Sequence, residues 1–215
     1  MLHNLYKALY YISFGSLLVP FLLGAIKFKT LNNTLRVLFF YLLISVITEI
    51  LSYLLPGKCL SCFYAVQNTF TILEGLFFVA IYLTIFTATV SKYIVATTGV
   101  IYIIFAASNF LSSKSYFGAD NLVSMVETVI IISLSILFYF KVFIDLRVSK
   151  FNSYSFILLN SAVLIFFSSS FVLFLFDDLI THISRMTFEH LWSLHLVTNI
   201  TYNIFLAAVI WKQHI

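Results

Sequence analysis

Long apolar runs, separated by short polar breaks, dominate the pattern of this chain. Seven runs each approach the length of about 20 residues that an α-helix needs to cross the hydrocarbon core of a bilayer. The polar and apolar positions do not alternate as they do in membrane-spanning strands. The pattern therefore predicts an all-α, polytopic integral membrane protein, a seven-transmembrane-helix bundle that forms a single domain over residues 1–215. The predicted spans are 8–26, 34–55, 63–86, 93–111, 122–144, 154–176 and 191–211.

Composition agrees with a chain that lies in a lipid bilayer. Hydrophobic residues make up 62% of the 215 positions and charged residues only 9%, whereas charged residues are about 25% of a typical soluble protein. This balance excludes a soluble enzyme, a secreted disulfide scaffold and a nucleic-acid-binding protein. The net charge of +4 needs no nucleic acid as a partner, because an excess of lysine and arginine on one side of the membrane explains it.

The lysine and arginine residues also predict an orientation. Of the 12, eight fall in the loops of one side or at the ends of the spans that border them, and this side is expected to be cytoplasmic. The N-terminus is then outside and the C-terminus is cytoplasmic. The eight are Lys27, Lys29, Arg36, Lys92, Lys141, Arg147, Lys150 and Lys212, and the other four are Lys7, Lys58, Lys114 and Arg185.

Three carboxylates lie within the predicted spans. An acid near the centre of a membrane helix costs about 2.5–3.5 kcal/mol on insertion scales, so each one suggests a function. The seventh span adds three polar residues at spacing i, i+4, i+8, which share one helix face. We expect an outward-opening pocket in the outer half of the membrane. Its candidate ligand-binding residues are Glu49, Gln67, Glu74, Glu127, His195, Asn199 and Asn203.

The alternative is that these polar residues only hold neighbouring helices together, as Ser, Thr, Asn and Gln commonly do in membrane bundles. The three acids favour the pocket, because the lysines and arginines lie between the predicted spans or near their ends and none lies deep inside a span to pair with them. Such acids require a proton, a metal ion or a cationic ligand.

The segment between the sixth and seventh spans carries further polar residues. Asp178 and His182, like Arg185 and Glu189, are four residues apart, which is typical of a solvated interfacial helix with two ion pairs. Zinc is the alternative, because it takes nitrogen and oxygen ligands. The candidate metal ligands are His182, Glu189, His190 and His195.

The cysteines Cys59 and Cys62 form a CxxC motif in the predicted outer loop between the second and third spans. A disulfide is expected if that side is oxidising. A redox-active pair is the other interpretation. Membrane thiol oxidoreductases need a second cysteine pair to pass electrons on, and this chain has only two cysteines.

Other seven-span proteins share single features with the chain. Retinal proteins need a lysine in the middle of the last span, but Lys212 lies at its end, so no retinal is expected. Intramembrane hydrolases of the adiponectin-receptor and ceramidase type carry HxxxH in the last span, whereas His190 and His195 are five residues apart. A sugar-transporter-like arrangement of three spans, a linker helix and three spans is a further alternative.

Most of the chain resembles a family of small, uncharacterised bacterial seven-transmembrane proteins. The resemblance rests on Leu73 to Phe78, on Asn160 to Ser168, and on His195 to Asn203 with Trp211 and Lys212 following. Members of that family are often encoded beside sensor histidine kinases. The resemblance implies a multi-pass protein of the bacterial inner membrane with a sensory or accessory role and a membrane signalling partner.

The predicted function is a non-enzymatic membrane sensor or accessory subunit that binds a proton or a small ligand, cationic or amphiphilic, in the outer pocket. Glu74 is the expected deep anchor, with Glu49 and Glu127 at the rim, His195 as a pH-sensitive contact and Asn199 as a hydrogen-bonding contact. A small-solute or proton-coupled transporter is the first alternative. An intramembrane metal-dependent hydrolase is the second. No cofactor is expected except, for that second alternative, a metal ion.

Overall fold

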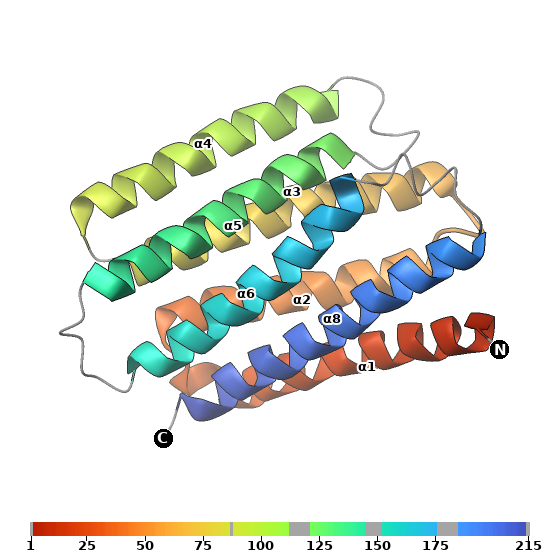
Figure 1. The fold of residues 1–215 in the computed structure, drawn as a ribbon, viewed down its shortest axis with the longest axis horizontal. Helices are drawn as coiled ribbons and strands as arrows, with labels where there is room; N and C mark the ends of the chain where they lie inside the picture. Colours follow the sequence, from red (N-terminus) through yellow and green to blue (C-terminus); the bar gives the residue numbers. More distant parts are fainter. Residues whose placement is uncertain (1, 87, 112–120, 145–151, 176–184, 214–215) are drawn as a thin grey trace. The chain divides into compact units, whose positions relative to one another are not determined.

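A computed structural model of the chain (Figure 1) describes residues 2–86, 88–111, 121–144, 152–175 and 185–213. These residues form helices and short connections, and no strand occurs among them. Seven α-helices are long and apolar enough to span a membrane, which confirms the predicted all-helical class and indicates a multi-pass membrane protein. The elements are α1 (Leu2–Lys27), the short 3-10 helix η1 (Phe28–Thr30), α2 (Asn33–Leu54), α3 (Leu60–Ile85), α4 (Thr89–Leu111), α5 (Asn121–Ile144), α6 (Asn152–Leu175) and α8 (Arg185–Lys212).

The first and the last helix begin further from their predicted starts than the other helices do, each six residues earlier. Helix α8 begins at Arg185, six residues before the predicted span, so Glu189 and His190 lie in its early turns. A helix satisfies its backbone hydrogen bonds within itself, so it can extend beyond the apolar run. Polar residues are therefore compatible with its first turns. The preceding residues 176–184 are outside the described part of the chain.

Local sequence determines where two of the helices begin. Asn32 precedes α2 in an extended conformation, and its Oδ1 accepts a hydrogen bond of 2.9 Å from the backbone N–H of Leu35. Cys59 precedes α3 in the same way, and its Sγ accepts the backbone N–H of Cys62. Both residues are N-caps, which supply an acceptor to a backbone donor that the helix itself leaves unsatisfied.

The chain divides into two compact units, each described here by itself. The first comprises Met1–Lys27 and Ser135–Ile215, and the second comprises Phe28–Leu134. The second unit therefore contains α2, α3, α4 and the start of α5, while the first contains α1, α6, α8 and the end of α5. This grouping differs from the two sets, spans one to three and five to seven, that the transporter-like arrangement expects.

In the second unit, α3 packs against α2 on one side and against α4 on another. Its core is formed by large side chains that are almost fully buried. Two glycines allow α3 and α4 to approach closely: a Cβ on Gly75 would lie 2.5 Å from Cε1 of Tyr102, and one on Gly99 would lie 2.7 Å from Cγ1 of Val79. The core includes Leu38, Leu42, Phe78, Ile81, Tyr82 and Tyr102.

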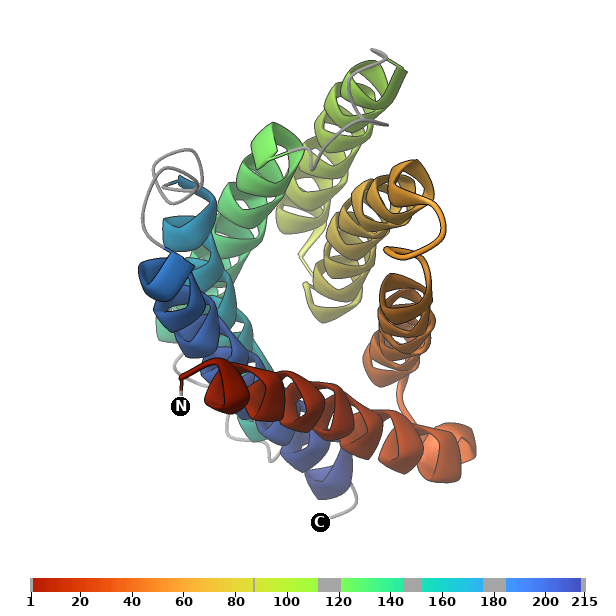
Figure 2. The ribbon, with the colours of Figure 1, turned by 90° about the vertical axis from the view of Figure 1, so that its right-hand side faces the viewer.

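In the first unit, α8 packs along α1 and against α6, and the views in Figures 1 and 2 both show α1 and α8 side by side. Its core contains Leu159, Val163, Leu206, Val209 and Ile210.

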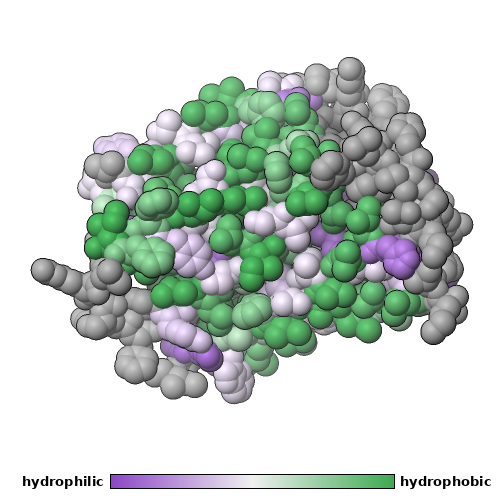
Figure 3. All heavy atoms as spheres, in the orientation of Figure 1, coloured by the Kyte–Doolittle hydropathy of each residue, from purple (hydrophilic) through white to green (hydrophobic). Residues whose placement is uncertain are grey.

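Large apolar side chains cover much of the outer surface. Ile26 is 81% exposed, Ile104 65% and Ile204 61%, and Figure 3 shows hydrophobic residues spread over the face that it draws. Isolated exposed apolar side chains are normal on a soluble protein, but a surface dominated by them is not. This surface fits contact with lipid.

Candidate functional site

In the second unit, α3 carries a half-buried carboxylate, that of Glu74. Oε1 of Glu74 accepts a hydrogen bond of 2.7 Å from the phenol O–H of Tyr41 on α2. Tyr41 is only 5% exposed, and its ring packs edge-on against Phe78, with 5.3 Å between the ring centroids. Because the aromatic contact holds the phenol in place, the hydrogen bond fixes the position of the Glu74 carboxylate.

A second carboxylate reaches the same place from α5. Glu127 is 3% exposed, lies against the backbone of Gly75, which hydrogen-bonds to its carboxylate, and is close enough to Glu74 for the two charges to interact. Its Oε1 is buried and has no hydrogen-bond partner within the described part of the chain. We call Glu74 and Glu127 the acid pair. Glu74 is thus held by a side-chain donor, whereas Glu127 is held only by the backbone of Gly75 and keeps one oxygen with no hydrogen-bond partner among the described residues.

Helices α2 and α3 are joined a second time, nearer to the start of α3. Nε2 of Gln67 donates to Oγ of Ser52 at 2.6 Å, and Oγ of Ser52 donates to the backbone oxygen of Thr48 at 2.7 Å. Glu49 is half-buried on the same stretch of α2. Of the three predicted acids, the structure therefore brings Glu127 to Glu74, while Glu49 lies near the α2 end of this second connection.

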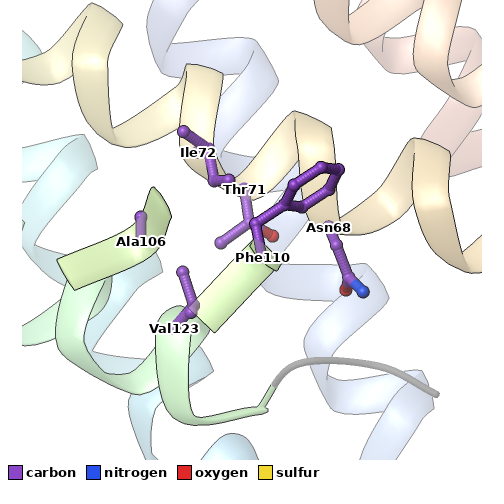
Figure 4. A pocket seen from close by; sticks show the side chains of 6 residues that line it. All are labelled: Asn68, Thr71, Ile72, Ala106, Phe110 and Val123. Atoms are coloured by element: carbon purple, nitrogen blue, oxygen red, sulfur yellow. The ribbon is translucent and has the colours of Figure 1, made fainter. Parts of the chain in front are cut away.

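A narrow hollow lies one helical turn from the acid pair (Figure 4). Its volume is about 190 Å³, which includes the open space at its mouth, and it nowhere opens wide enough for a water molecule. Thr71 precedes Glu74 by three residues and Val123 precedes Glu127 by four, so the hollow lies toward the N-terminal ends of α3 and α5. The side chains that line it are Asn68, Thr71, Ile72, Ala106, Phe110 and Val123.

In the first unit, two of the predicted site residues join α8 to α1. Nδ2 of Asn199 donates to Oγ of Ser13 at 3.1 Å, and Nδ2 of Asn203 donates to Oγ of Ser16 at 2.9 Å. Asn203 Nδ2 also lies 3.4 Å from Oδ1 of Asn199. We call these four residues the amide ladder. Its amide donors are used in contacts between and along the helices, which is how polar residues stabilise helix pairs in a membrane.

His195 stands one turn before the amide ladder, in aromatic surroundings. Its ring centroid is 5.5 Å from that of Phe166 on α6 and 5.4 Å from that of Trp192. Phe166 also stacks on Tyr202 at 4.6 Å. Nδ1 of His195 is buried and has no hydrogen-bond partner among the described residues. The ring is therefore packed as an aromatic group, with one nitrogen left unsatisfied.

The structure gives little support for a metal centre. Glu189 is half-buried and His190 exposed, and His182 lies outside the described residues. Within the described ranges, no group of three His, Cys, Asp or Glu side chains comes together. The four candidate metal ligands therefore stay a prediction.

The candidate residues belong to two units, so the single pocket expected from the sequence also stays a prediction. The second unit contains Glu49, Gln67, Glu74 and Glu127, and the first contains His195, Asn199 and Asn203. The sequence reasoning missed Tyr41, the donor that fixes Glu74. Its only signal in the sequence is a phenol in the middle of an apolar run, which needs a hydrogen-bond partner when it is buried.

No family model, curated protein or solved structure matches the chain. The resemblance to small seven-transmembrane proteins that accompany histidine kinases therefore stays a prediction, and the function has to be inferred from the residues themselves. The acid pair differs from the other polar contacts in combining two carboxylates, one of which has a buried oxygen with no hydrogen-bond partner among the described residues.

Proposed function

We propose that the chain is a non-enzymatic membrane sensor or accessory subunit and that the acid pair is its binding site for a proton or a small cation. The observation that carries the proposal is the buried, unsatisfied Oε1 of Glu127 beside the Glu74 carboxylate. A buried polar atom without a partner is costly, and a buried unpaired charge is more costly still. A proton on this carboxylate removes the cost of the buried charge, and a small cation compensates that charge and supplies the oxygen with a ligand.

The two members of the pair have different roles in this proposal. Glu74 is held by the O–H of Tyr41 and is the fixed half of the site. Glu127 comes from another helix and is the variable half, because two carboxylates at close range cannot both stay charged without strong repulsion. Occupation of the site thus decides whether α3 and α5 attract or repel each other at this point.

This change in attraction gives the protein two states. A bound proton or cation stabilises the arrangement in which Glu127 touches the backbone of Gly75, and its loss favours a looser contact. Helix α3 is joined to α2 by Tyr41 and by Gln67, so a shift of α3 is passed on to α2. Helix α2 begins beside Lys29 and Arg36, on the predicted cytoplasmic side, where a signalling partner would detect the change.

Infrared difference spectroscopy of the protein in lipid nanodiscs tests the binding site directly. A pH titration of the wild type is expected to show the carbonyl band of protonated carboxyl groups appearing in two coupled steps. Glu127→Gln and Glu74→Gln should each remove one step and displace the other along the pH axis. Glu49→Gln is the matched control, because it removes an acid from outside the pair, and should leave both steps in place.

The same variants decide between binding and transport. The titration is repeated with sodium and with choline as the only cation, and a site for a small cation responds to sodium alone. In vesicles loaded with a pH dye, a sensor should conduct no more protons than empty vesicles do. If Glu127→Gln gives the same infrared titration as the wild type, the acid pair is not the site. If the wild type conducts protons and Glu127→Gln abolishes this flux, the protein is a transporter and the sensor proposal is wrong.

A further inference from the structure

The start of α3 carries a disulfide between Cys59 and Cys62, whose Cα atoms are 5.2 Å apart. Cys59 is the N-cap of the helix and Cys62 lies in its first turn. The backbone N–H of Cys62 donates to Sγ of Cys59 at 3.2 Å, and Oγ of Ser61 lies 3.4 Å from the same sulfur. Two donors or potential donors thus surround Sγ of Cys59, and the N-terminus of a 26-residue helix points at it.

These surroundings of Sγ of Cys59 stabilise a thiolate. The N-terminus of a helix carries a partial positive charge, and a CxxC motif placed there favours the ionised sulfur. A sulfur that is stable as a thiolate is also a good leaving group in disulfide exchange. The other sulfur is accessible, because Cys62 is exposed while Cys59 is half-buried.

A structural role alone accounts poorly for this bridge. The two cysteines are only three positions apart, and a disulfide that closes so short a loop removes little conformational entropy from the unfolded chain. The bridge also joins residues that the helix itself already holds together, since the backbone N–H of Phe63 is bonded to the oxygen of Cys59 at 3.1 Å.

We infer that Cys59 and Cys62 form a reversible thiol–disulfide exchange site whose partner is a dithiol. A thiolate of the partner attacks Sγ of Cys62, the bond between the two sulfurs breaks, and its electron pair stays on Sγ of Cys59 as a thiolate. The second thiolate of the partner then attacks the partner's own sulfur in the mixed disulfide and releases Cys62, which takes a proton from water. Two electrons pass from the dithiol, which becomes a disulfide, to the cysteine pair, and the reverse sequence oxidises the pair again.

This site is independent of the acid pair. It uses neither Tyr41 nor the two glutamates, and Cys62 precedes Glu74 by 12 positions along α3. At about 1.5 Å per residue, roughly 18 Å of helix separates them. Failure of one proposal therefore leaves the other standing.

Redox titration of the full chain in detergent tests the inference. The protein is equilibrated with mixtures of reduced and oxidised dithiothreitol, and free thiols are trapped with a maleimide that adds mass. The pair is expected to convert reversibly as a two-electron couple while circular dichroism shows an unchanged helix content. A bridge that stays oxidised until the protein is unfolded in sodium dodecyl sulfate would overturn the inference.

Two single-cysteine variants test the assignment of the two sulfurs. Cys62→Ser leaves Cys59 at the N-cap, and Cys59→Ser leaves Cys62 while placing serine, a good N-cap residue, before the helix. At neutral pH the thiol of Cys59 should react with iodoacetamide at least about threefold faster than that of Cys62, because its larger thiolate fraction outweighs the lower nucleophilicity of a stabilised thiolate. Equal rates, or a faster Cys62, would refute the role given to Cys59.

Discussion

Replacement of Gly75 by alanine tests whether the close contact of α3 with α4 holds the second unit together. A methyl group at this position would lie 2.5, 2.8 and 2.9 Å from Cε1, Cζ and the hydroxyl oxygen of Tyr102. The Tyr102 side chain is 1% exposed and donates a hydrogen bond of 3.0 Å to the backbone oxygen of Thr71. The ring is therefore covered by other atoms of the protein and loses this bond if it moves.

The expected loss of stability follows from these contacts. Carbon atoms pack best at about 3.5–4.0 Å, so the ring has to move by about 1 Å. Overpacking of this kind costs about 1–3 kcal/mol, and a lost hydrogen bond adds about 1 kcal/mol. Alanine returns about 1 kcal/mol through its higher helix propensity. The unfolding free energy of Gly75→Ala should thus fall by about 1–3 kcal/mol.

Unfolding in mixed micelles with a rising fraction of sodium dodecyl sulfate, followed by circular dichroism, measures this difference. Gly15→Ala is the matched control, because a Cβ at Gly15 meets no atom within 4 Å, and it should not lower the stability. Tyr102→Ala removes the ring, so the double variant should lose less than the sum of the two single losses. The reasoning is refuted if Gly75→Ala matches the wild type, or if Gly15→Ala loses as much.

The same assay checks two predictions for the first unit. Asn203→Leu removes the donor to Ser16 and should lower the unfolding free energy by about 0.6–1.7 kcal/mol, as hydrogen bonds between membrane helices do. Thr201→Val, at an exposed position of the same helix, is the control and should change the unfolding free energy by less. Equal losses would contradict the stabilising role of the amide ladder. His195→Phe keeps a ring against Phe166 and removes the unsatisfied Nδ1, so stability should stay the same or rise by about 1 kcal/mol, and a clear loss would mean that this nitrogen has a partner.

The spans could be predicted from the sequence because one physical requirement determines them. A segment in lipid must satisfy its own backbone hydrogen bonds, so an apolar run of sufficient length is a helix whatever its neighbours are. The sequence did not predict that α8 begins as early as Arg185. The requirement for backbone hydrogen bonds applies within the apolar region and does not mark where a helix ends outside it. Glu189 and His190 interrupt the apolar run but not the helix.

The acid pair illustrates what the sequence does not contain. Counted from the start of its helix, Glu74 lies 14 residues along α3, about 21 Å, whereas Glu127 lies six residues along α5, about 9 Å. The two carboxylates can interact only because the two helices begin at different levels. The rotation and offset of neighbouring helices depend on side-chain packing, and the pattern of one helix does not record them.

The amide ladder and the acid pair show how polar groups inside a helical bundle can be told apart by what satisfies them. Asn203 directs its amide nitrogen at two acceptors, Oγ of Ser16 and Oδ1 of Asn199, so nothing further has to bind there. Oε1 of Glu127 is buried as deeply and has no donor among the described residues. Lipid supplies no donor either, and in the proposed function a species from outside the chain completes this site. Since the atom is a carboxylate oxygen beside a second carboxylate, that species carries positive charge, which is why the proposed ligand is a proton or a small cation.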